Sequence, residues 1–140
     1  MAPTIRVAIG DDSTAVLALW ARADAEPSAT DDADGIARLL AHDAGALLLA
    51  ERDGEVVGSI IAGWDGWRGS IYRLAVDPRC RRQGVARVLL AAAQARLDAL
   101  GTRRSQAIVV EGSASARAFW AASGWQQQTE RLRFVSPPED

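Results

Sequence analysis

The stretch of sequence that decides the fold runs Leu74-Ala75-Val76-Asp77-Pro78-Arg79-Cys80-Arg81-Arg82-Gln83-Gly84-Val85-Ala86-Arg87. It begins with three apolar residues that favour an extended strand. Asp77-Pro78 ends that strand, because proline has no backbone N–H to donate. From Arg82 onward the apolar residues recur at three- and four-residue steps, which predicts a helix. The stretch is therefore expected to form a strand, a short basic turn and a helix.

The turn brings together groups that favour a bound anion. Backbone N–H groups in the first turn of a helix lack intrahelical partners, and the helix dipole adds partial positive charge there. Gly84 has no Cβ, so a ligand can come close to the backbone, and Ala86 keeps the next turn small. The arginines of the segment are Arg79, Arg81, Arg82 and Arg87. A diphosphate suits such a site, and the alternative is a solvated basic loop before an ordinary helix.

Two common phosphate-binding motifs do not match this turn. A Walker A loop needs a second glycine followed by lysine and serine or threonine, and the turn has none of these. A dinucleotide fingerprint needs three glycines, whereas the turn has one.

The residues Arg81-Arg82-Gln83-Gly84-Val85-Ala86 resemble the Arg/Gln-x-x-Gly-x-Gly/Ala motif of the GNAT superfamily of acyl-CoA-dependent N-acyltransferases. Residues 74–78 resemble the end of the strand that precedes this motif in the family. Residues 113–125, SASARAFWAASGW, are similar to the family pattern N-x-x-A-x-x-F-Y-x-x-x-G-F. The resemblance covers about the second half of the chain, from Ala50 onward.

This resemblance implies that acetyl-CoA is the co-substrate and that an amine is the acceptor. The backbone of Leu74, Ala75 and Val76 would line the pantetheine arm like an added strand. The N–H groups from Arg81 to Ala86 would hold the CoA diphosphate, next to the charge of Arg87. Ser113 stands where the family has asparagine, and its hydroxyl is a candidate ligand of pantetheine.

The composition fits one soluble domain. The chain has 140 residues, 49% of them hydrophobic and 24% charged, and a net charge of -2. We expect a single N-acetyltransferase domain over residues 1–135 and a disordered tail over 136–140. The net charge argues against a nucleic-acid or anionic-membrane surface. No apolar run reaches transmembrane length and the N-terminus has no signal pattern, so we expect a cytoplasmic protein.

The chain pattern predicts an α/β fold with a mixed, mostly antiparallel sheet and helices on both faces. The expected strands are 4–9, 46–52, 56–64, 70–76 and 106–110, with candidate final strands at 126–128 and 132–135. The expected helices run from Asp11, Asp12 or Ser13 to Ala23, from a cap at Thr30 or Asp31, from Arg82 to Gly101, and from Ser113 to Ser123. Asp53-Gly54 predicts a hairpin turn. Strands 70–76 and 106–110 form a parallel, splayed pair, and ligands bind beyond their carboxyl ends.

Acyl transfer needs a base for the amine, donors for the oxyanion, and an acid for the leaving thiolate. The resemblance implies an oxyanion donor in a backbone N–H near Ala75 or Val76. Many relatives have tyrosine as the acid where this chain has Trp120, and indole cannot deliver a proton at neutral pH. Relatives that acetylate ribosomal-protein N-termini have a glutamate base where this chain has Ile108. Both usual proton carriers are therefore replaced.

Two other residues are candidates for proton transfer. Tyr72 shares strand alternation with Leu74 and Val76, so all three are expected on one face. If that face is the cleft, Tyr72 is an acid or a base; if it is the core, Tyr72 is a packing residue. Glu111 follows the fifth strand and either relays a proton through water or is a solvated strand-end charge.

Two further patches bear on the acceptor. Asp31, Asp32 and Asp34 either attract an amine or cap a helix. A second set of residues is aromatic and forms either an aromatic wall beside the acceptor or a homodimer surface. Its members are Trp64, Trp67, Trp120 and Trp125.

The sequence thus predicts an N-acetyltransferase that moves an acetyl group from acetyl-CoA to a primary amine of a small molecule or protein. One alternative is an acyl-CoA-binding sensor domain without turnover. Another is a non-enzymatic interaction domain that uses the exposed tryptophans.

Overall fold

The computed structural model describes residues 2–23, 28–109 and 114–137. The chain divides into two compact units, Met1–Ala107 and Ile108–Asp140. Each unit is described by itself below.

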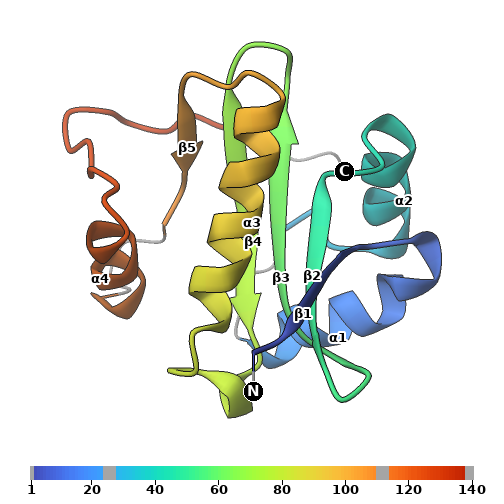
Figure 1. The fold of residues 1–140 in the computed structure, drawn as a ribbon. Coiled ribbons are helices and arrows are strands. Elements are labelled where there is room, and N and C mark those ends of the chain that lie inside the picture. Colours follow the sequence, from blue (N-terminus) through green and yellow to red (C-terminus); the bar gives the residue numbers. More distant parts are fainter. Residues whose placement is uncertain (1, 24–27, 110–113, 138–140) are drawn as a thin grey trace. The chain divides into compact units, whose positions relative to one another are not determined.

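The first unit is built on a five-stranded sheet (Figure 1). The strands lie side by side in the order β1 (Thr4–Val7), β2 (Leu47–Arg52), β3 (Glu55–Trp64), β4 (Gly69–Val76) and β5 (Ser105–Ala107). The first four are antiparallel, and β5 runs parallel to β4. The expected mixed sheet with one parallel pair is therefore confirmed.

The fifth strand is shorter than the sequence suggested. It ends at Ala107, and neither Ile108 nor Val109 belongs to a strand. Val110, the expected last residue, lies outside the described residues. Parallel pairing joins β5 to Gly69–Ile71 alone, so the pair is hydrogen-bonded only at the beginning of β4.

The hairpin between β2 and β3 turns at Asp53-Gly54, as expected. Both residues have positive φ angles, 54° and 77°. A two-residue turn of this handedness matches the right-handed twist of the strands it joins.

Helices cover both faces of this sheet (Figure 1). Helices α1 (Ser13–Arg22) and α2 (Ala33–His42) lie on one face, and α3 (Val85–Ala99) lies on the other. The side chains that form the core under α1 and α2 include Val16, Leu19, Trp20, Ile36, Leu47, Leu49 and Ile61. Leu89 and Leu97 of α3 are buried on the opposite face.

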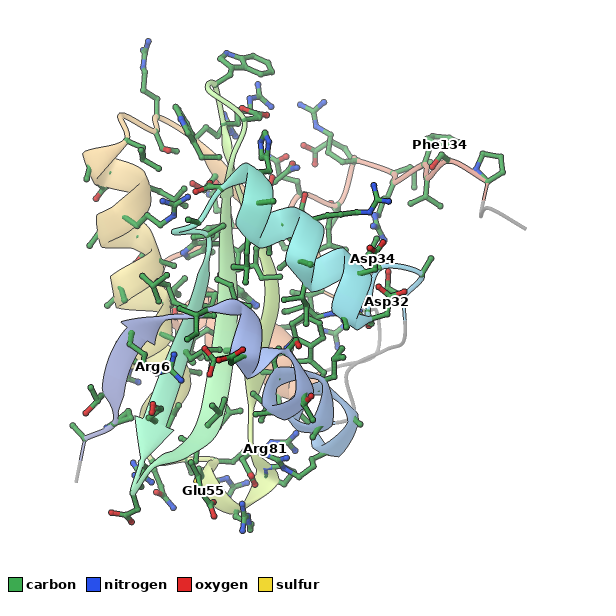
Figure 2. All side chains as sticks on the ribbon, turned by 90° about the vertical axis from the view of Figure 1, so that its right-hand side faces the viewer. Arg6, Asp32, Asp34, Glu55, Arg81 and Phe134 are labelled. Atoms are coloured by element: carbon green, nitrogen blue, oxygen red, sulfur yellow. The ribbon has the colours of Figure 1, made fainter. Side chains whose placement is uncertain are left out.

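Two helix starts differ from the sequence expectation. The cap of α2 is Asp32 (Figure 2) rather than Thr30 or Asp31, because Asp32 Oδ1 accepts a hydrogen bond from the Gly35 N–H at 2.7 Å. Helix α3 begins at Val85, three residues later than expected. The preceding Gly84 has a φ of 82°, which a helix cannot contain.

The second unit contains helix α4 (Ala114–Ala122). After this helix the chain turns at Gly124, and the rings of Trp120 and Trp125 meet edge to face at 4.7 Å. The expected strands at 126–128 and 132–135 are wrong, since residues 125–137 form no strand. Leu132 and Phe134 alternate with arginines, but a strand needs a hydrogen-bonded neighbour, and the described residues of this unit supply none.

Gly58 lets the first turn of α3 lie close to the sheet. A Cβ at this position would come within 2.8 Å of Leu89 Cδ1 and 2.9 Å of Val85 Cγ1. We expect Gly58→Ala to lower the free energy of unfolding by about 1–3 kcal/mol through overpacking. Urea denaturation measures this change. Gly10→Ala is the control, because its Cβ would meet no atom within 4 Å, and equal midpoints for the two variants would contradict the prediction.

Candidate active site

Strand β4 contains a bulge at Arg73. Ile61 pairs with Tyr72 and Ser59 pairs with Ala75, so Ile60 stands opposite both Arg73 and Leu74. Arg73 has a φ of 51°, which is uncommon for a residue with a side chain. The extra residue bends the strand and breaks the alternation of its side chains.

The expectation that Tyr72, Leu74 and Val76 share one face is therefore wrong. Tyr72 pairs with Ile61, which belongs to the core under α1 and α2. Val76 pairs with Gly58, whose missing Cβ would point at α3. A one-residue insertion moves every later side chain of a strand to the other face.

The backbone of β4 after the bulge has one edge without a strand partner among the described residues. The Asp77 N–H donates to the Val57 oxygen at 2.8 Å, so Asp77, and by alternation Ala75, direct their backbone groups toward β3. Leu74 and Val76 consequently direct theirs to the opposite side. There, within the described part of the chain, β5 pairs only with Gly69–Ile71. Leu74 and Val76 thus present N–H and C=O groups to which an extended amide chain can add.

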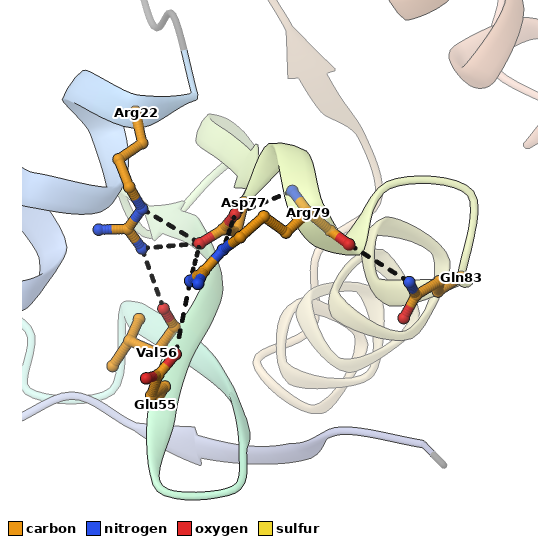
Figure 3. Close-up of polar contacts among 6 residues, drawn as sticks. All are labelled: Arg22, Glu55, Val56, Asp77, Arg79 and Gln83. Atoms are coloured by element: carbon orange, nitrogen blue, oxygen red, sulfur yellow. Dashed lines mark hydrogen bonds and ion pairs between the residues drawn. The ribbon is translucent and has the colours of Figure 1, made fainter.

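Asp77 organises the turn that follows the strand (Figure 3). Its carboxylate is 1% exposed and accepts hydrogen bonds from the Arg79 N–H at 2.9 Å and from the guanidinium groups of Arg79 and Arg22. The Arg79 side chain holds the pKa of Asp77 far below its ordinary value, with help from the Arg79 N–H and the charge of Arg22. Asp77 and Glu55 both pair with the Arg79 guanidinium, so the attraction of a bound anion by Arg79 stays a prediction.

The rest of the turn is held by side chains from other elements. Arg52 of β2 donates to the Gln83 side chain, and Gln83 donates to the Arg79 oxygen at 3.4 Å (Figure 3). Arg81 donates to the Ala23 oxygen at 3.2 Å. These bonds connect the turn to β2 and to the end of α1.

Gly84, the residue before helix α3, is exposed to solvent. Among the residues that the structure describes, no side chain caps the N-terminus of α3, and none has an atom within 4 Å of where a Cβ on Gly84 would lie. The side chains of Arg82 and Arg87 are exposed beside it. Uncapped N–H groups, an open approach and two exposed guanidinium groups together form a suitable cradle for an anion.

Tyr72 lines a hollow of about 180 Å³ on the face that carries α2. It is 51% exposed and so is not a core packing residue. His42, Trp64, Asp65 and Arg68 line the same hollow. The sequence offered no sign that His42 and Tyr72 line one hollow, because the packing of α2 against the sheet places both residues there.

The other expected site residues fall in or near the second unit. Glu111 and Ser113 lie outside the described residues. Ile108 is 56% exposed, and the indole of Trp120 packs against Trp125. No helix in the described ranges is long and apolar enough to cross a membrane.

Comparison with known proteins identifies the family. Residues 14–125 match the model of the acetyltransferase (GNAT) family. The chain belongs to this family. An acetyltransferase from Photorhabdus laumondii subsp. laumondii is 43% identical over 107 residues, which are 76% of this chain and 75% of the relative. This GNAT protein is therefore an acyltransferase.

Solved structures agree with the fold. Ard1 from Thermoplasma volcanium has a TM-score of 0.80 at 23% identity, covering 89% of this chain and 82% of that one. AAC(6')-Iy in complex with a bisubstrate analogue, CoA-S-monomethyl-acetylneamine, has a TM-score of 0.76 at 22% identity, covering 99% of each chain. The mixed five-stranded sheet of this GNAT acetyltransferase is thus the fold of these proteins.

The buried carboxylate of Asp77 makes the stability of the protein depend on pH. Folding lowers the pKa of Asp77. The ionised carboxylate therefore stabilises the folded protein fully above the ordinary pKa of aspartate, and this stabilisation is lost as the pH falls from that value toward the lowered pKa. We expect Asp77→Asn to lower the free energy of unfolding by about 1–3 kcal/mol at neutral pH. The difference from the wild type should shrink below about pH 4.

Urea denaturation at several pH values measures this difference. Asp34→Asn is the control, because Asp34 forms an exposed pair with Arg38 and its removal has little effect. A difference between wild type and Asp77→Asn that stayed constant with pH would contradict the prediction.

Proposed function

We propose that this acetyltransferase moves an acetyl group from acetyl-CoA to a primary amine of a small molecule or protein. The observation that carries the proposal is the succession of an unpaired strand edge at Leu74 and Val76 and an open helix N-terminus at Val85. CoA has a matching succession of groups, since its pantetheine arm carries amides and joins a diphosphate.

The donor-binding groups follow from this match. The backbone of residues 74–76 would bind the pantetheine amides, and the N–H groups from Arg81 to Ala86 would bind the diphosphate. Arg82 and Arg87 add positive charge beside them. The Gln83 side chain is already bonded to Arg52 and to the Arg79 oxygen, so Gln83 contributes its backbone. Ser113 remains a proposed ligand of pantetheine.

Acetyl-CoA supplies the acetyl group as an activated thioester. The amine nitrogen forms the new bond to the carbonyl carbon, the carbon–sulfur bond breaks, and the sulfur leaves with a proton. The protein must stabilise negative charge on the carbonyl oxygen. Of the two expected donors, Ala75 directs its N–H toward β3 and Val76 directs its N–H to the open side, which favours Val76.

Tyr72 is the proposed acid or base on the acceptor side. Its half-exposed ring lines the hollow that also contains His42 and Asp65. Trp120 cannot fill this role, because an indole N–H does not transfer its proton at neutral pH. Glu111 remains the second candidate.

Three further proposals concern the location of the protein, its partners and the extent of its domain. We propose a cytoplasmic location, where acyl-CoA is found, and no nucleic-acid or membrane partner. Because the family match spans both units, we propose that residues 1–135 act as one acetyltransferase domain. A homodimer remains a prediction, and a sensor without turnover is the alternative function.

Isothermal titration with acetyl-CoA tests donor binding. We expect the wild type to bind, and Gly84→Trp to abolish binding by filling the space in front of α3. Gly101→Trp is the matched control, because Gly101 has a similar φ of 90°, equally open surroundings and a place at the other end of α3. Retained affinity in Gly84→Trp would refute the site, and binding without amine-dependent thiol release would favour the sensor.

Turnover of Tyr72→Phe tests proton transfer. Loss of the hydroxyl should lower kcat at least about tenfold while leaving the KM for acetyl-CoA unchanged. Thiol release with a panel of amines and peptides measures both quantities. Ser70→Ala is the control, since Ser70 lines the same hollow, and an unchanged kcat in Tyr72→Phe would remove Tyr72 from the mechanism.

A further inference from the structure

A buried polar relay ends at the bulge of β4. The indole N–H of Trp20 donates to Ser59 Oγ at 2.9 Å, and the Ser59 hydroxyl donates to the Arg73 oxygen at 2.8 Å. Trp20 is 5% exposed and Ser59 is fully buried. A hydroxyl in such a core is costly unless it is fully bonded. Ser59 therefore satisfies the carbonyl that the bulge displaces.

The Arg73 side chain is held from the other direction. Its Nε donates to Asp31 Oδ1 at 3.0 Å, and a second guanidinium nitrogen pairs with Asp31 Oδ2. The guanidinium also lies 5.5 Å from the centre of the Trp20 ring. We name these four residues, Trp20, Asp31, Ser59 and Arg73, the bulge clamp.

The bulge clamp surrounds a residue in an unfavourable backbone conformation, since Arg73 has a positive φ angle. Left-handed φ angles bring Cβ close to the following carbonyl, so residues with side chains avoid them. Such a conformation persists only where the surroundings impose it, and it often occurs at a reactive site. Here the residue in the left-handed conformation is Arg73, which directly precedes Leu74, the first residue of the strand edge without a partner among the described residues.

We propose that Asp31 and Ser59 are positioning residues for acyl transfer, because they hold Arg73 left-handed and so aim the backbone of residues 74–76 at the thioester. This inference rests on the proposed function. It also assigns Asp31 a role other than amine capture. Both of its carboxylate oxygens accept bonds from Arg73, and one also accepts the Ser28 N–H.

Two substitutions of Arg73 separate backbone conformation from charge. Arg73→Ala removes the guanidinium but keeps Cβ, so the left-handed backbone loses its support. Arg73→Gly removes the same guanidinium and adopts positive φ freely. We expect Arg73→Ala to lower kcat at least about tenfold, and Arg73→Gly to recover most of that loss. The loss in kcat of Arg73→Ala should exceed any rise in its KM for acetyl-CoA, because residues 81–86, which would hold the diphosphate, are untouched.

Glycine at position 73 also gives a rescue test for the clamp. Ser59→Ala and Asp31→Asn should each lower kcat by a larger factor than they raise the KM for acetyl-CoA, and adding Arg73→Gly to either should restore kcat. Asp98→Asn is the control that should leave kcat unchanged, because Asp98 is an exposed carboxylate near the C-terminus of α3. Thermal melting confirms that each variant is folded, and titration with acetyl-CoA reports donor binding apart from turnover.

The kcat values of the two Arg73 variants decide whether the proposal holds. An Arg73→Gly enzyme as slow as Arg73→Ala would show that the guanidinium itself is needed and would overturn the proposal. An Arg73→Ala enzyme as fast as the wild type would overturn it as well. Failure of the proposed function is distinct, because the wild type itself would then neither bind acetyl-CoA nor release thiol.

Discussion

The left-handed backbone of Arg73 is the constraint on which the site depends. It inserts one residue into β4 and places Tyr72 and Val76 on opposite faces of the sheet. Without the inserted residue, the alternation of side chains would continue along β4, and Tyr72 and Val76 would lie on the same face. In the described part of the chain only two polar or charged side chains are buried, Ser59 and Asp77. Ser59 donates to the Arg73 oxygen just before residues 74–76, and Asp77, the residue just after them, accepts from the Arg79 N–H. The buried polar groups therefore fix the segment that the proposed chemistry uses.

The turn after β4 illustrates how charge is distributed around a proposed phosphate site. Arg79 neutralises a buried carboxylate, and Arg81 donates to a backbone oxygen, so these two arginines shape the turn. Arg82 and Arg87 remain exposed beside the open helix N-terminus. The cost of holding the turn in one conformation is thus met during folding, which leaves the backbone N–H groups ready for a ligand.

Much of this fold follows from local sequence signals. The Asp53-Gly54 hairpin, the parallel pair and the helices on both faces are confirmed, because turn chemistry and periodicity act over short distances. The bulge had no such signal, since arginine is a poor marker of positive φ, and the faces of Tyr72 and Val76 were consequently assigned wrongly. The partners of Arg79 depend on tertiary packing. The same holds for His42, which lines the same hollow as Tyr72. The strands expected within 126–135 failed for a related reason, since alternation alone does not supply a pairing partner.

The unpaired edge at Leu74 and Val76 has a consequence for the protein in solution. A strand edge with free N–H and C=O groups is a template for any other extended chain, and proteins generally protect such edges against aggregation. A bound donor would occupy the same groups, and binding to the folded state alone also raises its stability by mass action. A donor bound as proposed would therefore couple occupancy of the site to the resistance of the protein to aggregation.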